Sequence, residues 1–513
     1  MPNAVPDTLA PLVQRRHFCL SGSPSPLIPN ARHARIAGRY SLTSHPDLEL
    51  THLSDGGRSL TLLGYLLDPE DPAAGNADVL ARLLARLGRC TDVIAPTYRL
   101  AGRWVIVAHD GTDTLVFHDA SALRAVYYVE GPRGADGSSA RCASEPGLLS
   151  RASGLPLDPE ALAYLGTRID AVDEVYWMPG DTSPYAGIRA LLPNHYLELE
   201  TGLAVRYWPT APVPEIGFDR AVSEGIRLMR GQVEAAARRW PLSVSMTAGW
   251  DSRLMLALCR SVTPDLFAFT LRYPDQYATL PDLRVPARLL PKLGMRHHVI
   301  AYPARVDPDV RALARLNSGA LEKAYCADTQ ALLEGHPAGR VCVTGDVAEV
   351  VKVHYRVEGV ADRDLTPTHL ARLLRIGDGP FALRAMERWL ESARPSPIPL
   401  LDLFCWEQMG GRWQARIRSN HDTAHDSLAP FDCRLLLTTL LGVDEARRRR
   451  PGFDLFAALI RGLWPDVMAE PINPPEVPTL GRRLLGVAAK AKLTKIVPPA
   501  ARARLKRWLF GTA

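Results

Sequence analysis

The sequence has no run of uncharged apolar residues approaching the roughly 18 to 20 that a membrane-spanning helix requires. Its start, MPNAVPDTLAPLVQRRHF, lacks the charged segment followed by an apolar core that is typical of a secretory signal. The eight cysteines form neither a C-x-x-C pair nor a spacing typical of zinc ligands. These absences favour a cytoplasmic protein whose cysteines are buried thiols, without a disulfide framework or a zinc site.

Two common nucleotide-binding motifs are absent as well, the G-x-x-x-x-G-K-[ST] loop and the dinucleotide motif G-x-G-x-x-G. What the sequence has is length, since 513 residues with 47% hydrophobic and 23% charged suffice for two or three domains. The net charge of +6 is uneven, because residues 481–513 carry nine Lys or Arg and no acid. The composition of this basic tail is more typical of a solvated terminal helix than of a surface patch that binds a polyanion or an acidic peptide.

The order of the expected elements predicts an α/β protein with two domains. Residues 1–211 contain short strands such as LTLLGYLLD and RWVIVAHD, separated by turn signals, which indicates a layered β-rich domain. A proline-rich stretch, WPTAPVPEIGFD, marks a linker near residue 212. In residues 212–513 helical patterns alternate with the expected strands PLSVSM, DLFAFTLRY and RHHVIAY, which predicts a parallel sheet. Beyond about residue 360 the chain becomes mostly helical.

The stretch Ser243-Val-Ser-Met-Thr-Ala-Gly-Trp-Asp-Ser-Arg253 places a small-residue turn between a strand and a helix. Such a turn directs backbone N–H groups and the positive end of the helix toward bound phosphate. Thr247 and Ser252 add hydroxyls, Ala248 and Gly249 allow close approach, and Asp251 can hold a magnesium ion. With a Gly/acid loop at Gly345–Glu349, the pattern predicts a pyrophosphate site, whereas the turn alone would also suit an ordinary capped helix.

Thr247-Ala-Gly-Trp-Asp-Ser252 resembles the S-G-G-x-D-S loop of the asparagine synthetase superfamily. YAGIRALLPNHYLELETGLAVRYWP, DLRVPARLLPKLGMRHHVI and LAPFDCRLL are similar to further segments of that family. The resemblance implies a glutaminase-like (Ntn-type) N-terminal domain followed by an ATP-pyrophosphatase synthetase domain. It also implies ATP and Mg²⁺ as cofactors, an acyl-adenylate intermediate, and release of AMP and pyrophosphate.

One departure from the family concerns the source of the amine. Members that hydrolyse glutamine need Cys at position 2, but this chain has Pro2, and Cys19 would need internal cleavage to replace it. The resemblance is therefore greatest to ring-closing members, namely lasso-peptide cyclases, or β-lactam synthetases. It implies a peptide or small-molecule substrate that carries both a carboxylate and an amine, with a leader-binding protein and a protease as possible partners. No nucleic acid is expected.

The resemblance also implies roles for single residues. In Gly345-Asp-Val-Ala-Glu349, Glu349 takes the place of the second metal-binding acid and Asp346 lies beside the acyl group. Asp426 takes the place of an acid that helps deprotonate the amine. Three more residues are assigned to ATP: Arg253 near phosphate, and Met246 and Leu271 beside adenine. A late catalytic lysine has no clear counterpart, which leaves the tail residues Arg482, Arg483 and Lys490 as candidates.

Two alternative functions stay open at this point. A tRNA-modifying ATP-pyrophosphatase could share the pyrophosphate loop and use the basic tail to contact RNA. A non-catalytic scaffold is the other alternative, because Val347 and Ala348 replace small flexible residues and the late lysine is missing. Each residue assigned above also has a purely structural interpretation, as a cap, a turn acid or a core side chain.

Overall fold

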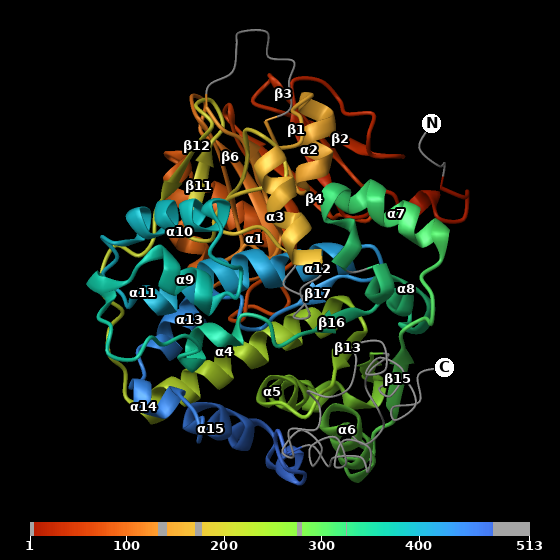
Figure 1. Ribbon diagram of the computed structural model, residues 1–513, viewed down its shortest axis with the longest axis vertical. Helices are drawn as coiled ribbons and strands as arrows, with labels where there is room; N and C mark the ends of the chain where they lie inside the picture. The colour runs from red at the N-terminus through yellow and green to blue at the C-terminus, as the bar shows by residue number, and fades with distance from the viewer. Residues whose placement is uncertain (1–4, 132–140, 170–176, 274–279, 325, 476–513) are drawn as a thin grey trace, which may run out of the picture.

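The computed structural model describes residues 5–131, 141–169, 177–273, 280–324 and 326–475 (Figure 1). Within these ranges no helix combines the length and the apolar character needed to cross a membrane. Pro2 and the basic tail with Arg482, Arg483 and Lys490 lie outside the described residues.

The N-terminal half holds two antiparallel sheets of six strands each. The first sheet has the order β10-β8-β9-β1-β3-β2, with β1 (Phe18–Ser21), β2 (Arg32–Ile36), β3 (Tyr40–Ser44), β8 (Tyr127–Val129), β9 (Cys142–Ala143) and β10 (Ile188–Ala190). The second has the order β12-β11-β7-β6-β5-β4, with β4 (Leu50–Asp55), β5 (Arg58–Leu67), β6 (Ala101–His109), β7 (Thr114–His118), β11 (His195–Glu198) and β12 (Leu203–Arg206). The expected β-rich domain is thus present as two sheets.

The two sheets pack face to face and are covered on their outer faces by helices. Alternate residues of β1 and β6, such as Leu20 and Val105, meet in one buried cluster between the sheets. Helix α1 (Asn76–Leu84) covers the outer face of the second sheet, and α2 (Pro146–Ser153) covers that of the first. The elements η1 (Ala10–Leu12), η2 (Cys90–Val93), η3 (Ala95–Arg99) and α3 (Pro159–Ile169) complete this half. The result is a layered arrangement in which each sheet buries both faces.

The C-terminal half is built on a parallel sheet of five strands, in the order β15-β14-β13-β16-β17. Its strands are β13 (Leu242–Ser245), β14 (Phe267–Arg272), β15 (His297–Ala301), β16 (Val341–Val343) and β17 (Ser427–Leu428). One face of the sheet packs against α5 and α6 through Leu242, Val244 and Met246. On the opposite face, α8 packs against Phe269 and Ile300. Strands β13, β14 and β16 are largely buried, and strands buried on both faces are marked by nearly continuous apolar runs.

Helices follow and surround the parallel sheet, and they dominate the chain beyond residue 360. The sheet region holds α4 (Phe218–Arg239), α5 (Trp250–Leu258), η4 (Cys259–Asp265), α6 (Pro281–Lys292), α7 (Pro308–Ser318), η5 (Gly319–Ala324) and α8 (Cys326–Gly335). Next come η6 (Ala348–Lys352), η7 (Asp362–Asp364), α9 (Pro367–Leu373), α10 (Pro380–Ala393), α11 (Leu400–Phe404) and the π-helix η8 (Cys405–Gln414). The last described elements are α12 (Ala415–His421), α13 (Arg434–Leu441), α14 (Glu445–Arg448), α15 (Asp454–Leu463) and η9 (Pro465–Met468). The expected mixed α/β class is confirmed, whereas the limits 1–211 and 212–513 stay a prediction.

Buried ion pairs join the two halves. Arg103 of β6 donates to Asp422, with 2.8 Å between Nη2 and Oδ2, and Arg416 of α12 donates to Glu145 at 2.8 Å. Helix α4 approaches the N-terminal half so closely that a Cβ at Gly231 would lie 2.1 Å from the carbonyl oxygen of Pro69. The two halves therefore share one continuous packed interior.

Candidate functional site

The site lies where the strand order of the parallel sheet reverses. From β13 the chain proceeds outward to β14 and β15, and it returns to place β16 on the other side of β13. In open α/β sheets, ligands bind outside the carboxyl ends of the strands at such a reversal. The loop 246–249 follows β13 and the loop 344–347 follows β16, so both segments singled out in the sequence meet at this edge (Figure 1).

The first loop is held in shape by its own side chains. The hydroxyls of Thr247 and Ser252 are 2.9 Å apart, and the N–H of Gly249 donates to the Thr247 hydroxyl at 3.2 Å. Gly249 precedes α5, so the positive end of that helix faces the loop. The Ala248 N–H donates to Asp282 Oδ1 at 2.9 Å, and Asp282 belongs to the first turn of α6. A carboxylate of the chain therefore occupies one position of the expected phosphate cradle.

The two loops touch through Gly345. A Cβ at this position would lie 2.5 Å from Cβ of Asp251, so only glycine allows the loops to approach this closely. Asp251 and Glu349 are thereby brought to the same ammonium group, because Lys352 forms an ion pair with Asp251 and lies 3.7 Å from Glu349 Oε1. Burial, together with the negative charges of Glu349 and Asp346, raises the pKa of Asp251 to about 6.

The second loop is fixed by a residue of the π-helix. Gln414 donates from Nε2 to Glu349 Oε2 at 3.0 Å, and its Oε1 accepts from the N–H of Val347 at 2.8 Å. Val347 has a φ of +71°, a conformation that is uncommon for a β-branched residue. One side chain thus positions both the carboxylate of Glu349 and the strained turn before it.

Asp346 lies in the same loop and has its own partners. It accepts from the Thr344 hydroxyl at 2.7 Å, and the Arg418 guanidinium approaches it to 3.1 Å. The structure therefore brings together the predicted residues Thr247, Gly249, Asp251, Ser252, Gly345, Asp346 and Glu349.

Asp251 and Glu349 are oxygen donors of the kind that magnesium prefers. The space between them is taken by the Lys352 ammonium group, however. In the described part of the chain, no three His, Cys, Asp or Glu side chains come together as a metal site. The arrangement therefore does not fit a divalent ion that bridges the two carboxylates.

Arg253 has a different environment from the one predicted. Its guanidinium is buried and donates to three backbone carbonyls, those of Val467 at 2.6 Å, Glu470 at 2.8 Å and Pro471 at 3.3 Å. Asn473, just beyond, donates from its N–H to the Ala248 carbonyl at 3.0 Å. The assignment of Arg253 to phosphate is wrong for this structure, because its side chain instead anchors the segment 467–473 against the loop.

The environment of Asp426 also differs from the one predicted. Its carboxylate contacts Arg103 at 3.1 Å and Arg124 at 3.0 Å, and Arg16 lies 3.9 Å away. Although the Asp426 side chain is only 16% exposed, these guanidinium groups hold its pKa well below the usual range. A carboxylate held by several arginines accepts a proton poorly, so Asp426 joins the two halves rather than serving as a base.

The two residues assigned to adenine differ in exposure. Met246 is fully buried, and its carbonyl accepts from the Thr270 hydroxyl at 2.8 Å, so in this structure it is a core residue. Leu271 is only partly buried and packs beside the Phe269 cluster, where contact with a ligand stays a prediction.

Several polar residues at this edge were missed by sequence reasoning. Arg418 links Asp346 to a second cluster, in which Tyr302 donates a hydrogen bond to Asp328 and His421 Nε2 lies 3.7 Å from the Asp328 carboxylate. Burial raises the pKa of Asp328 to about 6, and neither ring nitrogen of His421 has a hydrogen-bond partner among the described residues. For the cluster around Asp328, the sequence signal was Tyr302, which comes directly after β15. Lys352 could have been found from its position three residues after Glu349, which is within reach on a helical turn.

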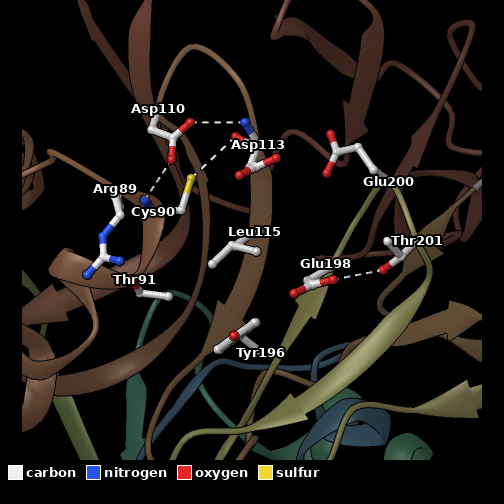
Figure 2. Close-up of a pocket in the computed structure, with 10 residues that line it drawn as sticks. All are labelled: Arg89, Cys90, Thr91, Asp110, Asp113, Leu115, Tyr196, Glu198, Glu200 and Thr201. Atoms are coloured by element: carbon white, nitrogen blue, oxygen red, sulfur yellow. Dashed lines mark hydrogen bonds between the residues drawn. The ribbon is translucent and has the colours of Figure 1, made fainter.

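A separate hollow of about 290 Å³ lies on the second N-terminal sheet (Figure 2). Its acids are engaged locally: Asp110 accepts from the N–H groups of Cys90 and Asp113, and Glu198 accepts from Thr201. Burial raises the pKa of the Cys90 thiol to about 12, and that of Cys19 in β1 to about 12 as well. Neither thiol is activated as a nucleophile.

Comparison of the sequence with protein families and with curated proteins finds no match. Among solved structures, the chain is similar to an NMN synthetase from Francisella tularensis (10% identity, 36% of this chain and 97% of that one, TM-score 0.17). It is similar to a glutamine-dependent NAD⁺ synthetase from Acinetobacter baumannii (17% identity, 40% and 42%, TM-score 0.17). It is also similar to the glutamine phosphoribosylpyrophosphate amidotransferase from B. subtilis (11% identity, 67% and 73%, TM-score 0.23). TM-scores this low do not establish a common fold.

Proposed function

We propose that the protein is an ATP-dependent, amide-bond-forming synthetase that converts a substrate carboxylate into an acyl-adenylate and couples it to an amine. The observation that carries the proposal is that the Thr247–Ser252 loop, which contains Asp251, meets the loop of Asp346 and Glu349 at the reversal point of the sheet. That position suits a nucleotide, and the loop has the small residues and hydroxyls that suit pyrophosphate.

The first step would be attack of a carboxylate oxygen on the α-phosphorus of ATP, which forms the mixed anhydride and expels pyrophosphate. The departing phosphates would be bound by the N–H of Gly249, the hydroxyls of Thr247 and Ser252, and the positive end of α5. Phosphate would also compete with Asp282 for the Ala248 N–H, so we expect that hydrogen bond to break when nucleotide binds.

The second step would be attack of the amine on the acyl carbon, with loss of AMP. Arg418, which holds Asp346, lies between the nucleotide loops and the Asp328 cluster. Asp328, with its raised pKa and its Tyr302 and His421 neighbours, is better suited than Asp426 to take up the proton of the amine. Exclusion of water would protect the anhydride from hydrolysis.

We further propose that the amine belongs to the substrate, so that the reaction closes a ring, as in a lasso-peptide macrolactam cyclase. Support comes from the N-terminal half, in which Cys19 is a buried β1 residue with an unactivated thiol, so that no described thiol is ready to release ammonia from glutamine. The glutaminase-like half would then serve as a support. A leader-binding protein and a protease would be the partners of such a cyclase.

The test is exchange of labelled pyrophosphate into ATP by the full-length protein, with a panel of peptides and small molecules that carry both a carboxylate and an amine. We expect substrate-dependent exchange that Asp251→Asn abolishes. Asp265→Asn, which changes the exposed last residue of η4, should leave the exchange intact. Absence of ATP binding by calorimetry would contradict the proposal and favour a scaffold. Salt-sensitive binding of tRNA would favour the RNA-modifying alternative.

A further inference from the structure

Lys352 is the last residue of η6 and is placed between the two loops of the site. Its ammonium group forms an ion pair with Asp251, lies 3.7 Å from Glu349 Oε1, and lies 5.0 Å from the centre of the Phe456 ring. The side chain is 11% exposed, so the charge is largely removed from water. A buried ammonium with two carboxylates and an aromatic ring around it is held in one position.

The charges of the site show what Lys352 does there. Three carboxylates converge on this edge, those of Asp251, Asp346 and Glu349. Arg418 is paired with Asp346, and among the described residues Lys352 is the cation that forms ion pairs with the other two. Without it, Asp251 and Glu349 would repel each other in a poorly solvated place.

The same position is where the family resemblance leads one to expect a divalent ion. An ammonium group there supplies one positive charge on a fixed covalent stem, and its donors can reach phosphate oxygens as well as carboxylates. Gln414, which positions Glu349, and Phe456, which lies against Lys352, hold the ion pair in place.

We propose that Lys352 is a built-in cation that replaces a divalent ion bridging Asp251 and Glu349, and that it contacts the pyrophosphate group of the nucleotide directly. The inference rests on the proposed function, since it assumes that pyrophosphate binds at this loop. It assigns to this chain a pyrophosphate site whose affinity does not depend on a metal held between the two carboxylates.

The test is isothermal calorimetry of inorganic pyrophosphate with the full-length protein, in EDTA and in Mg²⁺. We expect the wild type to bind in EDTA, and Lys352→Met to bind about tenfold to a hundredfold more weakly there, because a charged hydrogen bond is lost. Lys352→Arg keeps the cation and should keep binding in EDTA. The matched control is Lys292→Met at the end of α6, which removes the ion pair of Lys292 with Glu470.

A second measurement counts bound metal by the electron paramagnetic resonance of Mn²⁺ in the presence of pyrophosphate. Lys352→Met vacates the position between the carboxylates, so it should bind one more Mn²⁺ per chain than the wild type, and Mg²⁺ should restore its affinity for pyrophosphate. If the wild type binds pyrophosphate only with a divalent ion, and the variant behaves identically, the inference is wrong while the proposed function stands. If pyrophosphate and ATP bind under no condition, the proposed function itself fails.

Discussion

Gly345→Ala should weaken the site by separating its two loops. The added Cβ would lie 2.5 Å from the Cβ of Asp251, whereas two carbon atoms pack best at about 3.5–4.0 Å. The loops must therefore move apart by about 1 Å, at a cost of about 1–3 kcal/mol in the free energy of unfolding. A displacement of about 1 Å at an active site can lower a reaction rate about a hundredfold, so we expect the affinity for pyrophosphate to fall as well.

The assay has two parts, the free energy of unfolding in denaturant and the calorimetric affinity for pyrophosphate. Gly166→Ala in α3 is the control, because nothing lies within 4 Å of its added Cβ, and alanine is favoured over glycine in a helix. We expect the control to be at least as stable as the wild type and to bind equally well. If Gly345→Ala matches the wild type in both stability and affinity, the close approach of the two loops is not a requirement of the site.

Three further predictions concern stability. Arg253→Met should lower the free energy of unfolding by roughly 2–4 kcal/mol, because three carbonyls lose a charged donor. If the variant is as stable as the wild type but has lost its affinity for pyrophosphate, Arg253 binds phosphate after all. Unfolding in acid should take up several protons between pH 6.5 and about 4, since burial lowers the pKa of several histidines that become charged on unfolding. The five with the largest shifts are His17, His195 and His336, each with a pKa of about 4, and His421 and His425, whose pKa lies well below 6.5. A free energy of unfolding that stays constant from pH 7 to 5 would contradict this. Asp328→Asn should raise the free energy of unfolding by about 1–3 kcal/mol at pH 8 but not at pH 4. The reason is that the pKa of Asp328 is raised, so its ionised form destabilises the native state above about pH 6. An equal gain in stability at pH 8 and pH 4 would show that packing is the cause.

The sequence predicted those elements whose pattern is local. PLSVSM contains β13, DLFAFTLRY contains β14 and RHHVIAY contains β15, because buried parallel strands are marked by short apolar runs between turns. Strand β17 was missed, since it has two residues and pairs with β16, which lies more than 80 residues earlier in the chain. The π-helix η8 was also missed, because its wider turns leave no distinct period in so short a segment.

For the site, the sequence could bring Asp251, Gly345 and Glu349 to one edge, because each lies in the loop or first helical turn after a parallel strand, and the ends of such strands meet at one edge. It could not place Asp426 correctly, because the arginines that neutralise it, Arg103 and Arg124, come from more than 300 residues earlier. Arg253 was misplaced for the same reason: its carbonyl partners belong to a segment over 200 residues away. Proximity along the chain reveals a loop, but it does not reveal which distant charges will be packed against it.

The ion pairs between the two halves bear on how the protein can be dissected. If the chain were cut at residue 212, the C-terminal fragment would carry Asp422 and Arg416 without Arg103 and Glu145, leaving charges that had been buried in pairs. The fragment would also expose the apolar side of α4 that fits against Pro69. We therefore expect neither piece to fold stably without the other, and co-expression of both pieces would be the way to recover a native assembly.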